Sequence, residues 1–321
     1  MNEPIFIARQ DTLEQEILPA HWLAQYKLFG EESYTFQNKG IWKKLCMSSA
    51  AANDRDIHAE ALEEMLTTFS AEHTGKWMLT VYGMDAAVLE GLATMAAIAA
   101  NGTAMAAVAG NALLMHAITN SETAMQAISR SQTAMQRIAN STTAMDAIGG
   151  SRIARDAVQA SPYYNSYIKE NDMAIAKLAV ALANLESAGY SGMAGVAADS
   201  TAMTAVAASA TAMGKIAAVD AALSKLAAST TAMDALYARK KKLNGGSASK
   251  SGKFIILEIS ASNAFNTSKY GYATLSDGSK PDWSSYLAKY AFFRKYPKYA
   301  TYMLNDTDSD DYIYYFDIAS P

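Results

Sequence analysis

The sequence predicts a multidomain α+β protein with a long helical repeat region between two globular ends. Half of its 321 residues are apolar, which is enough to form buried cores and argues against a disordered chain. A ten-residue period fills the middle, and 16 of the 31 aromatic residues lie in the last part. We expect an N-terminal α/β module at 1–90, decapeptide helical repeats at 91–238, a basic and Gly/Ser-rich linker at 239–252, and an aromatic-rich, mainly β domain at 253–321.

The composition excludes several function classes. A formal net charge of −4 disfavours a general nucleic-acid-binding protein, because neutralising phosphates requires clustered Lys and Arg. A single cysteine, Cys46, excludes a disulfide framework and a cysteine-rich zinc site. The chain has no glycine-rich phosphate loop, no Gly-x-Ser-x-Gly elbow and no other nucleophile set. We therefore expect no enzyme activity, no cofactor and no bound metal.

One segment, 91–121, has no formal charge and needs to be weighed as a membrane span. A span requires about 20 strongly apolar residues, whereas this segment is rich in Ala and is interrupted by Asn101, Gly102 and Gly110. The first ten residues also lack the basic and apolar pattern of a signal peptide. We expect a soluble protein without membrane insertion.

The N-terminal part has the patterning of a small mixed module. Alternating apolar residues predict strands, and apolar residues three to four apart predict helices. The expected elements are strands at 4–9 and 76–82, helices at 13–28 and 56–69, and a hairpin at 33–42. His58 shares a helix with Glu60 and Glu63, but no second histidine follows at four-residue spacing, so a solvated helix face is favoured over a metal or acid–base group.

The central part repeats every ten residues. Methionine recurs at 95, 105, 115, 125, 135 and 145, and Ile or Val follows three residues after each. Tyr163, Tyr164 and Tyr167 interrupt the pattern. It then resumes in a shifted frame with Met or Leu at 193, 203, 213, 223 and 233. Such a period is the signature of a repeat architecture.

The period is incompatible with one continuous helix. Ten residues of α-helix rotate through about 1000°, roughly 80° short of three turns, so the Met/Ile stripe would wander around the axis. Coiled coils need seven or eleven residues. Each unit therefore predicts a Ser or Thr N-cap, about two turns of helix and a tight reversal, with αL caps at pairs such as Gly149–Gly150.

The repeats are compatible with two architectures. Helices this short do not persist alone in water and must bury their Met and Ile against neighbours. The first possibility is a helical solenoid within one chain, and the second is a trimeric stack to which three chains contribute helices. In both, Met at helical spacing is predicted to fill the core and not to bind metal or peptide.

The C-terminal part has the residue types of a small β domain. Strands are expected at 254–259, 270–275 and 312–318, with a turn at 276–279, while 283–302 is helical or irregular. The basic run at 239–242 is interpreted as a solvated helix C-terminus favoured by the macrodipole, against a nucleic-acid or lipid patch.

The same domain holds the candidate receptor-binding residues. Exposed aromatic rings stack on sugar faces and carboxylates bind hydroxyls, although such rings equally serve to fill a small core. An acidic loop resembles a calcium loop, with Asp317 at the twelfth position, but its sixth position is Asp311 and not Gly, so an exposed acidic loop is favoured. The candidates are Tyr270, Tyr272, Trp283, Tyr299, Asp306, Asp308 and Asp310.

The repeat unit resembles decapeptide repeats in tail-fibre and related virion proteins of tailed bacteriophages. The resemblance rests on the Ser-x-Thr-Ala-Met-x-Ala-Ile pattern at 121–130, 131–140 and 141–150, and it extends over about 92–236. It implies a homotrimeric appendage of the virion tail, present in the host cytoplasm before assembly. The N-terminal part would attach to other tail proteins, and the distal domain would contact a host surface glycan or protein.

Two other function classes remain open. One is a virion scaffold or adaptor, in the tail, the collar or the capsid decoration, that does not contact the host. The other is a bacterial surface adhesin or peptide-binding repeat protein. Lectin-like binding by the C-terminal domain would favour host recognition, whereas tight binding to a virion protein would favour the scaffold.

Overall fold

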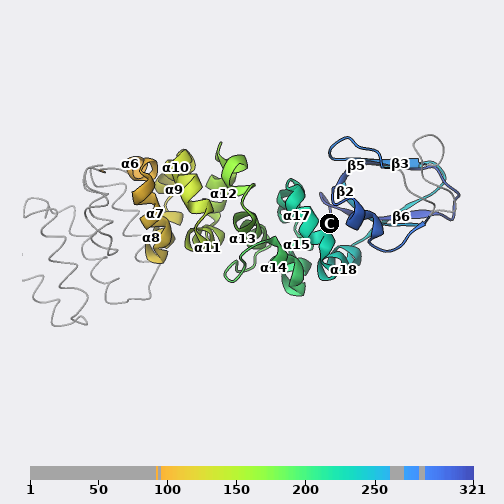
Figure 1. Ribbon diagram of the computed structural model, residues 1–321, viewed down its shortest axis with the longest axis horizontal. Helices are drawn as coiled ribbons and strands as arrows, with labels where there is room; N and C mark the ends of the chain where they lie inside the picture. Colours follow the sequence, from red (N-terminus) through yellow and green to blue (C-terminus); the bar gives the residue numbers. More distant parts are fainter. Residues whose placement is uncertain (1–91, 93–94, 261–270, 282–285) are drawn as a thin grey trace, which may run out of the picture. The chain divides into compact units, whose positions relative to one another are not determined.

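The computed structural model describes residue 92 and residues 95–260, 271–281 and 286–321. The described part mixes α-helices with a C-terminal antiparallel sheet (Figure 1). Contacts divide the chain into two compact units, 1–168 and 169–321, and each is considered by itself. The elements predicted for 1–90, together with His58, Glu60 and Glu63, lie outside the described residues.

Short helices follow one another along the repeats, as the ten-residue period predicts. In the first unit these are α6 (Met95–Ala100), α7 (Gly102–Gly110), α8 (Ala112–Thr119), α9 (Glu122–Ser129), α10 (Gln132–Ala139), α11 (Thr142–Gly150) and α12 (Arg152–Ala160), followed by the π-helical turn η2 (Tyr164–Ile168). In the second unit they are α13 (Asp172–Leu182), α14 (Met193–Ala198), α15 (Ser200–Ala208), α16 (Ala210–Ala217), α17 (Asp220–Ala228) and α18 (Thr230–Ala238).

The predicted N-caps and core positions are confirmed. Ser131 and Ser141 have extended backbones, and the Oγ of each accepts a hydrogen bond from the N–H three residues on, at 3.2 and 3.1 Å. The repeated Met and the Ile, Val or Leu three residues later are buried, as Met135 and Ile138 illustrate. Serine thus caps several repeat helices as predicted, whereas Asn or Asp caps α7, α13 and α15, and α14 and α17 begin without a side-chain cap. The apolar stripe forms the core.

The predicted αL caps at the helix ends are wrong. Gly149 and Gly150 belong to α11, and the residue that ends this helix, Ser151, is extended. Ser151 is also the N-cap of α12. At this junction the residue after α11 already has the extended backbone that starts α12, so no residue remains for an αL cap. At α9 and α10 a separate C-cap is present, Arg130 or Asn140, but its φ is negative and it is not αL either.

The same serines join helices that are distant in sequence. The Oγ of each donates to a carbonyl 32 residues earlier, near the end of a preceding helix, at 2.5–2.6 Å; the pairs are Ser131 with Ala99, Ser141 with Ala109, Ser151 with Thr119, Ser161 with Ser129, and Ser229 with Ala197. We call this set the serine ladder. One hydroxyl thus accepts a hydrogen bond from a free backbone N–H at the start of one helix and donates one to a free carbonyl near the end of another.

Within each unit, a helix packs most extensively against the third helix after it. In the first unit α7 lies against α10, α8 against α11, and α9 against α12. In the second unit α13 lies against α16, α14 against α17, and α15 against α18. The shifted frame at Met193 preserves this order, because the irregular segment 183–192 lies between α13 and α14 without adding a helix.

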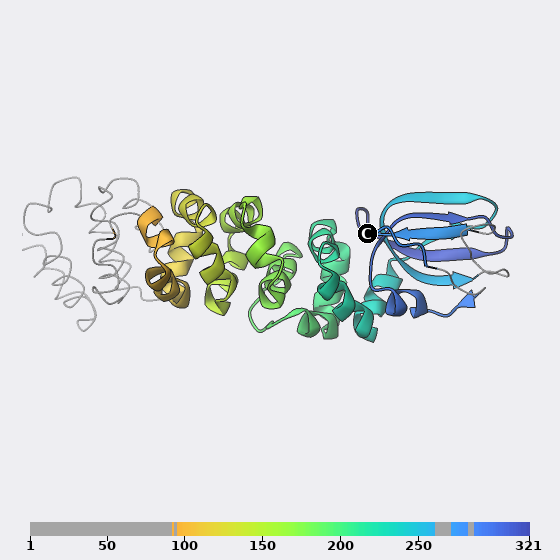
Figure 2. The same cartoon turned by 45° about the horizontal axis from the view of Figure 1, so that its top comes forward.

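The C-terminal sheet is antiparallel throughout its described strands. Its elements are β1 (Lys241–Asn244), β2 (Ala248–Ser260), β3 (Gly271–Leu275), β4 (Tyr286–Leu287), α19 (Ala291–Lys295), β5 (Ala300–Asn305) and β6 (Tyr312–Asp317). The strand order is β1-β6-β2-β5-β3, and β4 pairs with β2 (Figure 2). The register of β2 shifts around Gly252, whose φ of +132° favours glycine. Residues 248–251 pair with β5, Phe254 pairs with both β5 and β6, and the residues that follow pair with β6.

The strand predicted at 254–259 is confirmed, and its six consecutive buried residues have a structural reason. Phe254, Ile256 and Ile259 pack in the core of the sheet. Ile255 and Leu257 face the other way and share a core with the helices from α13 to α18. The sheet and the last repeats are therefore held by one continuous apolar core.

Residues 239–252, predicted as a flexible linker, are mostly strand in the structure. β1 begins three residues after α18 ends, and β2 begins at Ala248. The glycines between them form a tight turn: a Cβ on Gly245 would lie 2.0 Å from the carbonyl oxygen of Asp308, and Gly246 has a φ of +84°. The Gly/Ser composition thus reflects close backbone approach and not a linker.

Other C-terminal expectations are confirmed in part. The turn at 276–279 is present, and Tyr312–Asp317 forms β6. Within 283–302, the structure has the short helix α19 and the start of β5, which the sequence did not predict as a strand. Among the described helices, none has the length and apolar character needed to cross a membrane.

Candidate functional site

The predicted receptor-binding residues do not form one surface. Tyr272 lies on β3 beside the end of β5 that leads into the acidic loop. Tyr299 lies at the opposite end of β5, with its carbonyl bonded to Ser276. Leu304, which is opposite Tyr272, is five residues from Tyr299 along β5, or about 16 Å. Tyr270 and Trp283 lie outside the described residues.

The two described candidate rings are covered by lysine ammonium groups. Lys280 Nζ lies 4.5 Å from the centre of the Tyr272 ring, and the Tyr302 ring is 5.5 Å away on the next strand. Lys253 Nζ lies 5.6 Å from the centre of the Tyr299 ring. A sugar that stacked on these faces would have to displace a favourable cation–π contact.

The acidic loop between β5 and β6 is exposed at Asp306, Asp308 and Asp310. Asp306 accepts a hydrogen bond from Ser247, and the carbonyl of Asp308 accepts one from the N–H of Asp311. Across the described residues, no three His, Cys, Asp or Glu side chains are grouped as metal ligands. The loop is thus held by its own polar contacts and by the β1–β2 turn.

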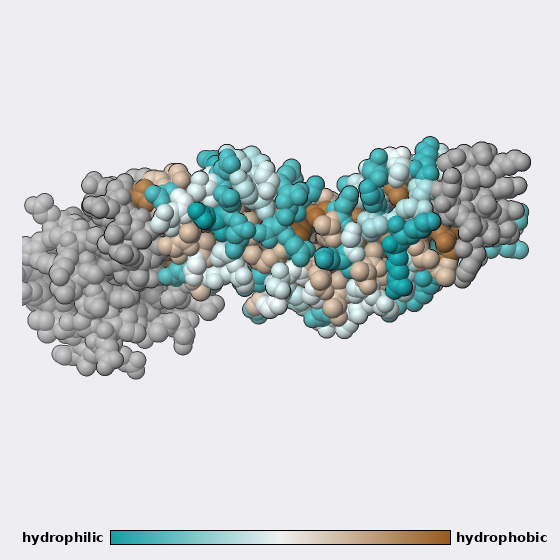
Figure 3. Space-filling model, viewed as in Figure 1, coloured by the Kyte–Doolittle hydropathy of each residue, from teal (hydrophilic) through white to brown (hydrophobic). Residues whose placement is uncertain are grey.

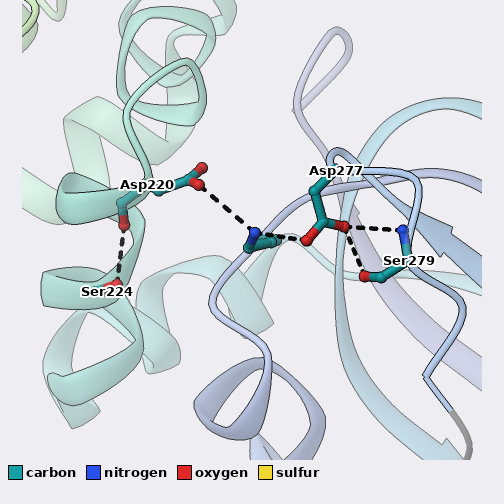
Figure 4. A network of polar contacts seen from close by, with 5 residues as sticks. Asp220, Ser224, Asp277 and Ser279 are labelled. Carbon is teal, nitrogen blue, oxygen red and sulfur yellow. Dashed lines mark hydrogen bonds and ion pairs between the residues drawn. The ribbon is translucent and has the colours of Figure 1, made fainter.

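A shallow polar depression of about 300 Å³ lies between the α16–α17 turn and the sheet. Lys298 Nζ forms ion pairs with Asp277 at 2.7 Å and with Asp220 at 3.7 Å (Figure 4). The hydrogen bonds from Lys298 and Ser279 hold the pKa of Asp277 well below its usual range. The lining residues are Lys169, Ala217, Ala218, Asp220, Ser276, Asp277 and Tyr299. Both carboxylates of the lining, Asp220 and Asp277, pair with Lys298, so the depression joins α17 to the sheet.

The basic run 239–242 was predicted as a solvated helix C-terminus, and in the structure only Arg239 caps α18. Arg239 donates to the carbonyl of Pro321 at 3.2 Å, and Lys241 pairs with Asp317 at 3.7 Å. Lys240 and Lys242 point to the other face, because successive side chains of an extended chain alternate. Of the four basic residues, Lys241 forms an ion pair, Arg239 donates a hydrogen bond to a carbonyl, and Lys240 and Lys242 have no ion pair with a described residue.

Lys240 and Lys242 lie over tyrosine rings. Lys240 Nζ is 4.2 Å from the centre of the Tyr237 ring and 5.2 Å from that of Tyr314, and Lys242 Nζ is 5.0 Å from that of Tyr312. The register explains the contacts, since Lys242 is directly opposite Tyr314 on the neighbouring strand β6. We call Lys240, Lys242, Tyr237, Tyr312 and Tyr314 the lysine–tyrosine strip.

A buried carboxylate supports the strip from behind. Glu258 is 8% exposed and accepts hydrogen bonds from the hydroxyls of Tyr237 at 2.6 Å and Tyr312 at 3.4 Å. Burial and the bond to Glu258 raise the pKa of Tyr237 above its usual value. A bulge in β2 between Ile256 and Glu258 brings the carboxylate to this face. The hydroxyls of two rings are thereby fixed in place.

A third lysine at the edge of the strip is neutralised. Lys289 Nζ lies 4.4 Å from the centre of the Tyr237 ring and 3.1 Å from Asp234 Oδ1. Hydrogen bonds from Tyr290 and Lys289 lower the pKa of Asp234. Asp234 belongs to α18, so this contact also ties the last repeat helix to the chain just after β4.

Sequence reasoning missed the lysine–tyrosine strip. The signal was the run of four basic residues followed by Gly and Ser, which was interpreted as the end of a helix and a linker. Had the run been interpreted as the start of a strand, period-two alternation would have separated Lys240 and Lys242 from their neighbours. No protein-family model matches the chain, and a comparison with curated proteins also found no match.

Proposed function

We propose that the protein is a tail fibre or related structural protein of a tailed bacteriophage virion. In this proposal the N-terminal part attaches to the particle, the repeats form a helical solenoid that acts as a spacer, and the C-terminal sheet meets the host. The repeat pattern at 121–150 is the basis for the phage assignment. The protein would reside in the virion tail and would act without catalysis.

The observation that carries the proposal is the core shared by the last repeats and the sheet. Met213, Leu223 and Met233 of the repeats belong to the same buried cluster as Ile255 and Phe316 of the sheet. A spacer that presents a binding domain benefits from such a joint, because the domain keeps a fixed orientation on the repeats. Repeats stacked on neighbours can also vary in number without a change in their fold.

A scaffold or adaptor within the particle is the alternative, and one observation favours it. The rings predicted to bind a receptor are covered by Lys280 and Lys253, and the candidate residues are distributed over both ends of β5. A surface used only for assembly would not require a prepared sugar platform.

Trimerisation stays part of the proposal because the resemblance to tail fibres implies it, but the described repeat surface does not add to the case. In the described residues, Ile153 at 39% is the only large apolar side chain that is exposed, and hydrophilic side chains are spread over the repeat surface (Figure 3). Light scattering on the purified chain tests the trimer, and a stable monomer of about 34 kDa excludes it.

Cell binding separates the two functions. The purified full chain, labelled at its N-terminus, is mixed with a panel of bacterial strains and sedimented with the cells. Host recognition predicts saturable binding to some strains, displaced by unlabelled protein. Absence of binding across the panel, together with tight binding to isolated virion tail proteins, would establish the adaptor instead.

A further inference from the structure

The lysine–tyrosine strip holds two ammonium groups without neutralising them. Among the described residues, no carboxylate lies within ion-pair distance of Lys240 or Lys242, whereas Lys241, Lys250, Lys289 and Lys298 each pair with an aspartate. A ring attracts a cation through its quadrupole and carries no net charge. The contacts with tyrosine therefore orient both ammonium groups and leave their charge available to an anion.

The faces of the tyrosine rings in the strip are occupied by lysine ammonium groups or by a neighbouring ring. Tyr237 and Tyr314 each have an ammonium group within about 5 Å of the ring centre. Tyr312 lies against Tyr314 at 4.6 Å and carries Lys242. Single-stranded nucleic acids are held largely by bases stacked on open aromatic faces. The ring faces of the strip carry lysines or pack on another ring, which disfavours single-stranded nucleic acid as its ligand.

We infer that the lysine–tyrosine strip binds an anionic polysaccharide through Lys240 and Lys242. The ligand carries phosphate or carboxylate groups at intervals along a hydroxyl-rich chain. The two lysines are two residues apart in extended chain, so their attachment points are separated by about 7 Å and engage successive anionic groups. The edge of β1 away from β6 has no partner strand among the described ones, which keeps this side of the sheet open to a polymer.

This inference rests on the proposed host contact, and it adds that the ligand is an anionic polysaccharide and that the lysine–tyrosine strip binds it. It replaces neutral-sugar stacking on Tyr272 and Tyr299 with charge recognition on the β1–β6 face. The phenol groups add little direct contact, since those of Tyr237 and Tyr312 are bonded to Glu258. Their role is to fix the lysines, which reduces the side-chain entropy lost on binding.

Binding is tested with the full chain and three defined polysaccharides. The probes are a polygalacturonate for carboxylate, a poly(glycerol phosphate) for phosphate, and neutral dextran. We expect binding to at least one anionic probe, weakened by salt because the contacts are ionic, and no binding to dextran. The double variant K240Q/K242Q is expected to weaken anionic binding about tenfold or more, because hydrogen bonds from charged groups are the stronger ones.

Two variants control for charge and for folding. K225Q/K295Q removes the same net charge from exposed positions on α17 and α19, outside the strip, and is expected to keep binding within about twofold. K240R/K242R keeps both charges and is expected to restore most of the affinity. The melting temperature of each variant is compared with that of the unmodified chain, so that loss of fold is separated from loss of contact.

The outcomes separate this inference from the proposed function. Equal loss in K240Q/K242Q and K225Q/K295Q means unspecific charge attraction and overturns the site. Binding of single-stranded DNA in place of the polysaccharides, lost in K240Q/K242Q, overturns the ligand class. Cells bound equally by the unmodified chain and K240Q/K242Q leave host recognition standing and refute the strip. Probe binding that depends on Lys240 and Lys242, without binding to any cell, supports the strip and refutes host recognition.

Discussion

The repeats and the sheet of this protein are stabilised by different means. In the repeats, small Ala-rich helices bury one Met or Leu and one aliphatic residue per unit, and at five turns a serine hydroxyl bonds to a carbonyl 32 residues earlier. In the sheet, large rings such as Phe254 and Phe316 fill the core, and lysines lie over tyrosines on the surface. Small side chains and bonds repeated at a fixed spacing hold one region, and large aromatic side chains without a repeat hold the other.

The largest expected effect is a loss of packing where the two regions share a core. Phe316 is fully buried in the cluster that joins the sheet to α13–α18. Phe316→Ala is expected to lower the free energy of unfolding by about 3–5 kcal/mol, as large-to-small core changes do. In urea denaturation, near-ultraviolet circular dichroism follows the aromatic core and far-ultraviolet signal follows the helices. We expect both transitions to shift, and a shift in the near-ultraviolet signal alone would mean that the sheet folds independently.

A smaller effect is expected from the serine ladder. Ser151 Oγ donates to the carbonyl of Thr119 and accepts from the N–H of Ala154, at a site that is 5% exposed. Ser151→Ala is expected to cost about 1–2 kcal/mol, because it removes a cap and leaves a buried carbonyl without its donor. Ser151→Thr keeps the hydroxyl and should recover most of this loss. Thr142→Ala, at an exposed position in the first turn of α11, is the control. An equal loss in the free energy of unfolding for this variant would mean that the bonds of the serine ladder do not stabilise the repeats specifically.

The next effect has the opposite sign. Gly214 lies inside α16, and a Cβ at this position meets no atom within 4 Å. Gly214→Ala is expected to stabilise the protein by about 0.5–1 kcal/mol, since glycine costs conformational entropy in a helix. Thermal unfolding measures it. A lower melting temperature would indicate that the repeat surface at Gly214 is covered by something in solution, such as a second copy.

The smallest effect concerns the polar joint between α17 and the sheet. Lys298 and Ser279 lower the pKa of Asp277, so this contact stabilises the fold above the unfolded pKa of about 4 and is lost as pH falls below it. Asp277→Asn should therefore lower the melting temperature slightly at neutral pH, and the difference should shrink in acid. Asp310→Asn in the exposed loop is the comparison, and a difference that persists in acid would contradict the ionic origin.

The difference between the regions also explains what could be predicted from sequence. Short helices, Ser caps and buried Met follow from residues within ten positions of one another, so the period alone predicts them. The αL caps at Gly149 and Gly150 failed, because one residue, Ser151, ends one helix and starts the next. The sequence pattern predicted a C-cap and a separate N-cap at this junction, where the structure uses Ser151 for both.

The sheet depends on partners distant in sequence. Asn244-Gly245-Gly246 has the composition of a linker, and only contact with Thr307, Asp308 and Asp311 identifies it as a turn between strands. Likewise, alternation along a strand separates Lys240 and Lys242 from Arg239 and Lys241, but the tyrosines that they contact are identified only once β6 is placed beside β1. The sequence could therefore have indicated the two lysines and not the complete lysine–tyrosine strip.

The packing of each helix on the third one after it sets a rule for how such a chain can grow. Because each helix packs on the third helix after it, three helices make one turn of the stack. Duplication of a single decapeptide would therefore rotate every later helix of the same stack, and the sheet attached to its end, by about one third of a turn. Gain or loss of three decapeptides together would preserve the direction in which the sheet faces. Natural variants in which the direction of the sheet matters should then differ in length by multiples of 30 residues. A length difference of 10 or 20 residues would indicate that the direction of the sheet is not constrained.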